Sequence, residues 1–185
     1  MSQSHLSFAA IPLAALLAFS MIIVPAFAAP AYTSTTSGQI TAQGAKYRFH
    51  ATTEGNIPHA ADAYMNSVLV FGYQWVDLPD CDLSNCGTGI LAVVATKQPL
   101  DGSASNPNKW HVYNIRFTEH PTSTCLGSSQ VVASESQTAV VVIHRNNIDV
   151  MMDANVSSVS PDTFDGVGAF ILYMVDNGVL CMSGP

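Results

Sequence analysis

Beyond residue 38, the chain consists of short runs rich in β-branched and aromatic residues, separated by clusters of Gly, Pro, Asn, Asp and Ser. Such runs, bounded by turn residues, are typical of β-strands. No stretch of about a dozen residues repeats its apolar positions with the 3.6-residue period of an amphipathic helix. The pattern predicts ten strands, at residues 39–42, 46–53, 67–76, 90–96, 110–118, 129–134, 138–145, 148–154, 168–175 and 179–182.

Three of these strands contain unbroken apolar runs rather than alternating ones: VLVF at 68–71, ILAVVA at 90–95 and AVVVI at 139–143. A strand that is apolar on both faces is expected to be covered on both sides. Asn146–Asn147 and Asp176–Gly178 are predicted to be hairpin turns, because Asn and Gly tolerate positive φ. The pattern as a whole predicts an all-β fold, a single antiparallel β-sandwich or jelly-roll-like domain of about 8–10 short strands.

The first 28 residues differ from everything that follows. Residues 6–28 carry no charged side chain and end in Ala26-Phe27-Ala28, which matches the A-x-A signature of a signal-peptidase site. We therefore expect a secretory signal peptide at 1–28, a flexible spacer at 29–38 and a disulfide-containing β-sandwich domain at 39–185. The apolar segment is also long enough to span a bilayer, so an uncleaved anchor is the alternative. Both interpretations place the domain outside the cell, either secreted or on the extracellular face of the membrane.

All four cysteines lie after this apolar segment, at Cys81, Cys86, Cys125 and Cys181. An even number of cysteines in an exported chain predicts two disulfides. Of the three possible pairings we favour Cys81–Cys86, which closes a local turn, together with Cys125–Cys181, which closes a long loop and so stabilises more. A thiolate metal site is the alternative, but C-x4-C followed by two distant single cysteines does not have zinc-finger spacing.

Charge and composition exclude two classes of protein, nucleic-acid binders and intrinsically disordered chains. The 185 residues include 6 Lys+Arg and 13 Asp+Glu, and 48% of residues are hydrophobic. Nucleic-acid binders need clustered basic residues, so this class is excluded. The hydrophobic content is too high for an intrinsically disordered chain. Most of the acidic residues are Asp in turn sequences, where the short side chain bonds nearby backbone N–H groups.

The sequence holds no motif with a catalytic mechanism. No G-x-S-x-G nucleophile elbow is present, and only three Glu follow the apolar segment. Few carboxylates are thus left outside turns for the acid pair of a glycosidase. A triad assembled from distant strands is recognised only in space. An enzyme is therefore disfavoured, and a β-rich hydrolase with a non-obvious site remains an alternative.

Histidines and aspartates provide candidate metal ligands. Imidazole suits copper and zinc, and Asp-rich loops supply oxygens for Ca²⁺. The candidates are His50, His59, His111, His120, Asp77, Asp80 and Asp82. The competing interpretation is structural, because a histidine that alternates with core residues usually bonds the backbone and Asp is a common turn residue.

Asn155-Val156-Ser157 is an N-x-[ST] glycosylation acceptor, which agrees with export. Taken together, the sequence favours a secreted or cell-surface β-sandwich module with a binding or structural role. Its expected partner is an extracellular protein or glycan, or a second copy added through a sheet edge. The alternative is a metal-binding extracellular protein that uses His and Asp at strand ends, with Ca²⁺ or a transition metal as cofactor.

Overall fold

The computed structural model describes residues 30–58, 69–78, 89–97, 109–118, 122–175 and 178–183. This part of the chain forms ten strands and two short 3-10 helices, η1 (Ala31–Thr33) and η2 (Ala154–Val156). The strands are β1 (Thr35–Gln43), β2 (Lys46–Thr53), β3 (Leu69–Asp77), β4 (Ile90–Thr96), β5 (His111–Phe117), β6 (Ser129–Gln137), β7 (Ala139–His144), β8 (Asn147–Asp153), β9 (Gly166–Met174) and β10 (Leu180–Ser183). The prediction of an all-β chain is confirmed, and most predicted strands agree with these bounds to within a few residues.

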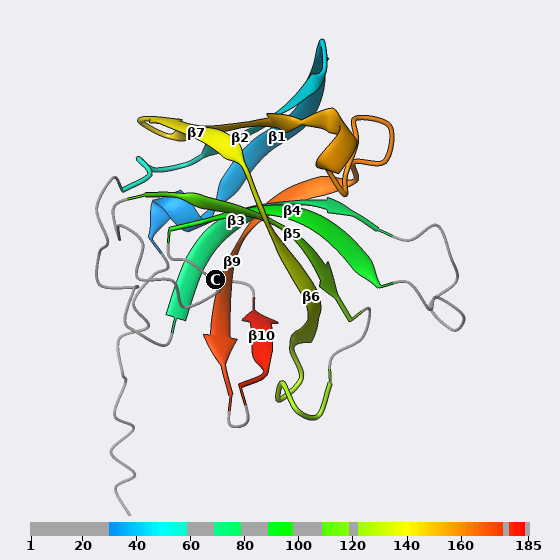
Figure 1. Ribbon diagram of the computed structural model, residues 1–185. Helices are drawn as coiled ribbons and strands as arrows, with labels where there is room; N and C mark the ends of the chain where they lie inside the picture. Colours follow the sequence, from blue (N-terminus) through cyan, green and yellow to red (C-terminus); the bar gives the residue numbers. More distant parts are fainter. Residues whose placement is uncertain are drawn as a thin grey trace, which may run out of the picture.

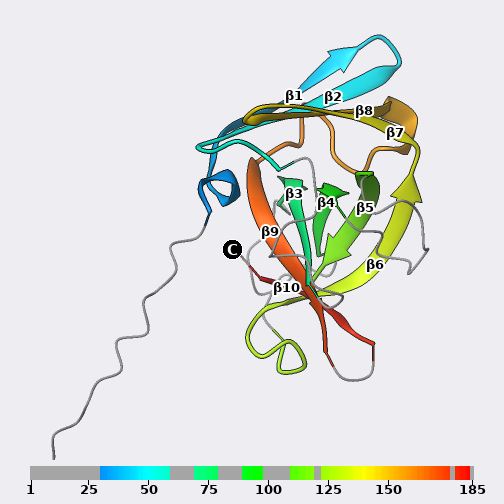
Figure 2. The same ribbon diagram turned by 90° about the vertical axis from the view of Figure 1, so that its left-hand side faces the viewer.

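The strands form two antiparallel layers. A four-stranded sheet with the order β1-β2-β8-β7 lies across one side of a closed six-stranded barrel with the order β10-β6-β5-β4-β3-β9 (Figures 1 and 2). The barrel closes because the short strand β10 pairs on both sides, Cys181 lying opposite both Gln130 of β6 and Tyr173 of β9. Closure removes both edges of that sheet. The predicted two-layer arrangement is thus present, with one of its layers closed on itself.

A core of aromatic side chains joins the sheet to the barrel. Phe49 of β2 and Trp75 of β3 are fully buried, and their rings meet edge-to-face with centroids 5.7 Å apart. The Trp75 indole Nε1 donates a hydrogen bond of 2.9 Å to the backbone oxygen of His50. This bond satisfies the polar atom of a buried tryptophan and fixes β2 over the barrel.

A second core fills the barrel itself, with Phe117, Phe170 and Leu172 among its fully buried members. Strand β4 contributes Val93 to the first core and Val94 to the second. The prediction that the apolar run at 90–95 is covered on both faces is therefore confirmed.

The same prediction is wrong for the run at 139–143. Strand β7 is the last strand of the four-stranded sheet, and its side chains alternate between half-buried and exposed. Val140 is 60% exposed and Val142 is 52% exposed. The reason is topological, because only one face of this sheet has the barrel beneath it.

The predicted spacer at 29–38 also differs from the structure. Residues 35–38 belong to β1, where Gly38 lies opposite Ala51 of β2. Upstream of β1, the Tyr32 ring meets Phe71 edge-to-face at 5.4 Å, and Tyr32 O accepts a hydrogen bond of 2.7 Å from the Tyr73 hydroxyl. The small polar residues predict a flexible chain, but from Pro30 onward this segment is held by aromatic packing and strand pairing.

The first hairpin turn falls one residue earlier than predicted. His144 pairs with Asn147, so Arg145 and Asn146 form the turn, and Arg145 takes the positive φ of 55°. Asn146 is instead bound to β2, because its Nδ2 donates to Thr53 O at 3.0 Å. Tertiary contacts therefore decide the position of the turn.

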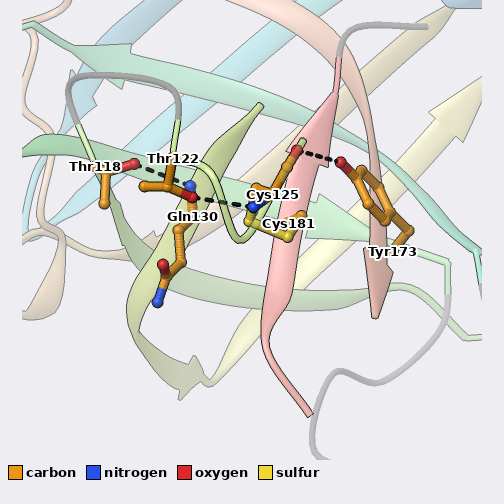
Figure 3. Close-up of a disulfide and its surroundings, with 6 residues drawn as sticks. All are labelled: Thr118, Thr122, Cys125, Gln130, Tyr173 and Cys181. Atoms are coloured by element: carbon orange, nitrogen blue, oxygen red, sulfur yellow. Dashed lines mark hydrogen bonds between the residues drawn. A yellow bond between two sulfur atoms is a disulfide. The ribbon is translucent and has the colours of Figure 1, made fainter. Parts of the chain in front are cut away.

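The predicted disulfide between Cys125 and Cys181 is present (Figure 3). Both cysteines are fully buried, with Cα atoms 5.5 Å apart, and the bond ties the 122–128 turn to β10. The Cys125 oxygen accepts a hydrogen bond of 3.0 Å from the Tyr173 hydroxyl, and its N–H donates to Thr122 Oγ1 at 3.1 Å. Cys81 and Cys86, the other predicted pair, lie outside the described residues.

Candidate functional site

The outward face of the four-stranded sheet carries a cluster of polar side chains. Along β2, buried residues alternate with Arg48, His50 and Thr52, which point away from the barrel. On the neighbouring strand β8, Asp149 lies opposite His50, and Asn147 lies opposite Thr52. Strand alternation and antiparallel register thus bring these five side chains together.

Four hydrogen bonds connect the polar cluster. Asp149 Oδ1 accepts from Arg48 Nε at 2.8 Å and lies 2.8 Å from His50 Nδ1. The other ring nitrogen of His50 is 3.2 Å from the Thr52 hydroxyl, and that hydroxyl donates to Asn147 Oδ1 at 2.9 Å. The cluster therefore crosses β2 and β8 as one connected network.

Asp149 is the electrostatic centre of this network. Burial alone would raise the pKa of its carboxyl group, but the hydrogen bonds and positive charge supplied by Arg48 and His50 outweigh burial and hold the pKa below its usual value. The same contact with Asp149 raises the pKa of Arg48. The ionised carboxylate is therefore the form that the fold stabilises.

The order Asp149–His50–Thr52 resembles that of an acid, base and nucleophile in a triad. Two observations argue against catalysis by this cluster. The Thr52 hydroxyl donates its hydrogen to Asn147, and none of the five side chains lines the groove beside β7 or the hollow beside Asn114. We conclude that the network stabilises the sheet and gives its outer face a fixed pattern of polar groups.

Next to this cluster, β7 exposes an apolar edge. Val140 lies opposite Met151 of β8, and Val142 lies opposite Asp149. In the described residues β7 pairs with β8 alone. Among the described strands the sheet thus ends in β7, whose outward valines are exposed and whose second backbone edge has no strand partner.

A groove runs along this free edge. It has a volume of about 640 Å³, and β7 residues 139–143 line one wall, while Lys97, Lys109 and Trp110 line the other. The Trp110 ring stacks on Tyr73 with centroids 6.0 Å apart, and the Lys97 ammonium lies 5.8 Å from the Trp110 centroid. Lys97 is only 1% exposed, and this burial lowers its pKa. The groove therefore combines a free strand edge, an aromatic ring and positive charge.

The candidate metal ligands are not brought together where they are described. His50 belongs to the polar cluster, His111 begins β5 on the strand face shared with Tyr113 in the barrel, and Asp77 ends β3. Among the described residues, no group of three or more His, Cys, Asp or Glu side chains is arranged to hold a metal ion. The remaining candidates, His59, His120, Asp80 and Asp82, lie outside the described residues.

The glycosylation candidate Asn155 lies in η2 and is exposed. Its position would leave a glycan free to project into solvent, and its modification stays a prediction.

Sequence reasoning singled out His50 but missed its partners. The signal was present: Arg48, His50 and Thr52 alternate with apolar residues, and Asp149 stands between Ile148 and Val150. Strand alternation alone assigns these side chains to the outer face. What the sequence lacked was the register between β2 and β8.

Comparison with known proteins provides no functional assignment, because no family model, curated protein or solved structure matches the chain. In the part of the chain that the structure covers, none of the helices has the length and apolar character needed to cross a membrane. The predicted signal segment at 1–28 lies outside that part.

Proposed function

We propose that this chain is an exported β-module, secreted or held at the cell surface, that acts by binding an extended polypeptide strand at the free edge of β7. The single observation that carries the proposal is the exposed, uncharged apolar edge formed by residues 139–143. Natural proteins usually protect a sheet edge with charges, proline, bulges or a covering segment, since an open edge recruits other strands. An edge without such protection is suited to strand addition.

The other edge of the same sheet provides the contrast. Strand β1 carries mostly small polar residues, and its first half approaches β9 closely. The Thr35 hydroxyl donates to Val167 O, and a Cβ on Gly38 would collide with the Val167 side chain. One edge is therefore polar and partly covered, and no strand among the described residues covers the apolar edge.

Register identifies the groups on β7 that a guest strand would meet. In a hairpin closed by a two-residue turn, the pair that flanks the turn exchanges backbone hydrogen bonds, and such pairs then alternate along the ladder. His144 and Asn147 are that pair, so Val142 and Val140 also direct their backbone toward β8. The N–H and C=O groups of Ala139, Val141 and Ile143 then point to the free edge.

Peptide binding tests this proposal. A labelled five-residue peptide of sequence TVTVV is titrated with the protein and followed by fluorescence anisotropy. The same peptide with N-methyl groups at alternate residues is the control, because it cannot form the ladder hydrogen bonds. We expect saturable binding of the first peptide and loss of binding on N-methylation. Equal binding of both peptides would contradict strand addition.

Two variants locate the site on β7. Val141→Pro removes an edge N–H while leaving the ladder with β8 intact, and we expect it to abolish binding. Val142→Lys places a charge on the exposed outward face and is expected to weaken binding with little effect on folding. Circular dichroism and thermal unfolding verify that both variants fold. Unchanged peptide affinity in both folded variants would rule out the β7 edge as the binding site.

A further inference from the structure

We infer that the β7 groove receives the C-terminal end of its guest strand, in antiparallel pairing, with the terminal carboxylate beside Lys109. This inference rests on the proposed function, since it specifies which part of a partner chain pairs with β7.

The groove is a fork that is closed at one end. Strands β5 and β6 pair as far as Val112 and Gln137. The chain that leaves β6 then turns away from β5, and β7 begins two residues later at Ala139. Lys109 and Trp110 immediately precede β5 and line the groove together with the first residues of β7. A guest strand that reaches this apex meets two strands already bonded to each other. The guest must end there or turn away, which favours a chain terminus.

Strand direction decides which terminus reaches the apex. Every strand pair in the described sheets is antiparallel, and antiparallel pairing is slightly more stable per residue. Strand β7 begins at the apex with Ala139 and runs outward to His144. An antiparallel guest therefore runs inward and places its C-terminus at the apex.

The exposed positive charge at the apex matches a carboxylate. Lys109 is exposed at the rim, whereas Lys97 is buried against the Trp110 ring. Lys109 is one of only 6 Lys and Arg in the whole chain, and no Asp or Glu is among the described residues that line the groove. An anion placed here would form charge-assisted hydrogen bonds with the exposed ammonium. The low charge of the surrounding strands makes this end of the groove the distinctive feature for recognition.

A second copy of the chain fits this groove less well as an occupant. Its β7 is attached to β8 on one side and continues from β6 at its start. Pairing β7 with the β7 of a second copy would therefore bring the attached β6 and β8 of that copy to the groove as well. A single strand can enter the groove without such attached strands. We therefore assign the groove to the tail of a partner protein.

Three TVTVV peptides that differ only at their last position test the inference. The first ends in a free carboxylate, the second in a carboxamide, and the third is an amide whose last residue is Asp. A charge-assisted hydrogen bond predicts that the free acid binds about ten-fold more tightly than the plain amide. The Asp amide is expected to bind like the plain amide, because its carboxylate lies on a side chain rather than at the chain end.

Lys109→Met is expected to remove the preference for the free acid while leaving strand binding in place. Lys46→Met is the matched control, because Lys46 lies on β2, pairs with Asp153, and is absent from the groove lining. Equal affinity of free acid and plain amide would overturn the inference and leave strand binding intact. Tight binding of the Asp amide would overturn the choice of a chain terminus. Failure of all three peptides, or dimerisation of the protein through β7 in sedimentation, would overturn the proposed function itself.

Discussion

At the scale of single residues, Asp149 shows how a surface position acquires a structural role. One carboxylate oxygen, Oδ1, accepts a hydrogen bond from Arg48 Nε and lies 2.8 Å from His50 Nδ1. The Asp149 side chain is only 25% exposed. Ion pairs between exposed side chains contribute little, whereas hydrogen bonds to a half-buried charge contribute more. The cluster therefore stabilises the contact between β2 and β8 at the centre of the outer face.

The lowered pKa of Asp149 predicts a pH dependence of stability. Because the folded-state pKa lies below the ordinary value of 3.8, the stabilisation is complete above pH 3.8 and is lost as the pH falls through the folded-state pKa. Asp149→Asn is expected to lower the free energy of unfolding by about 1–2 kcal/mol at neutral pH. The difference between variant and wild type should shrink below about pH 3.8, as measured by urea unfolding at a series of pH values.

Asp153→Asn provides the control on the same sheet. Asp153 faces Lys46 at 3.5 Å with both side chains more than half exposed, so its loss should cost less than about 0.5 kcal/mol. A cost for Asp149→Asn that stays constant down to pH 2 would show that the carboxylate charge is not the stabilising feature.

At the scale of elements, neighbouring strands of the barrel approach each other closely at Gly72. Gly72 on β3 lies opposite Phe170 of β9 and Thr96 of β4. A Cβ built on Gly72 would lie 2.5 Å from the Ala95 backbone oxygen and 2.8 Å from Phe170 Cζ. Glycine is required here because a backbone atom, which cannot rotate away, occupies the space.

Gly72→Ala is therefore expected to destabilise the protein by about 1–3 kcal/mol, the usual cost of overpacking. Gly168→Ala is the matched control on neighbouring β9, since a Cβ there meets only Gln74 Nε2 at 3.9 Å. That variant should be neutral or slightly stabilising, because alanine reduces the entropy of the unfolded chain. Chemical unfolding compares the two, and equal stability of both variants would refute the requirement for glycine at position 72.

At the scale of the whole molecule, two features connect the parts of the fold. The chain passes directly from the barrel to the four-stranded sheet, since only Thr138 separates β6 from β7 (Figure 2). At the barrel, the disulfide links Cys125 to Cys181 across 56 positions of sequence. The short strand β10, on which barrel closure depends, is thus fixed by a covalent bond.

Replacing both Cys125 and Cys181 by alanine is expected to cost about 4 kcal/mol, the loop-closure term for a disulfide of this span. Tyr173→Phe, which removes only the hydrogen bond to the Cys125 oxygen, should cost about 1 kcal/mol. Thermal and urea unfolding under non-reducing conditions measure both. A double alanine variant as stable as the wild type would show that β10 is held by strand pairing alone.

The sequence by itself determined the all-β class, most strand positions and the pairing of Cys125 with Cys181. These depend on simple signals in the sequence: β-branched runs, turn residues and an even number of cysteines. It also named His50, as a candidate metal ligand, and the structure places that histidine in the polar cluster of β2 and β8. The strand and turn signals each lie within a few neighbouring residues, so they can be recognised without knowing which strand is the partner.

Only the tertiary structure decided which strands meet and where the layers end. The apolar runs at 90–95 and 139–143 look alike in sequence, yet β4 is central in the barrel and β7 is the open edge of the sheet. Asp149 joined His50 only through the register of β2 with β8. The physical reason is that covering a strand, closing a barrel and forming a groove are all set by contacts between segments far apart in the chain. A run of valines records that a surface is apolar, whereas the topology determines whether another strand of the same chain covers it.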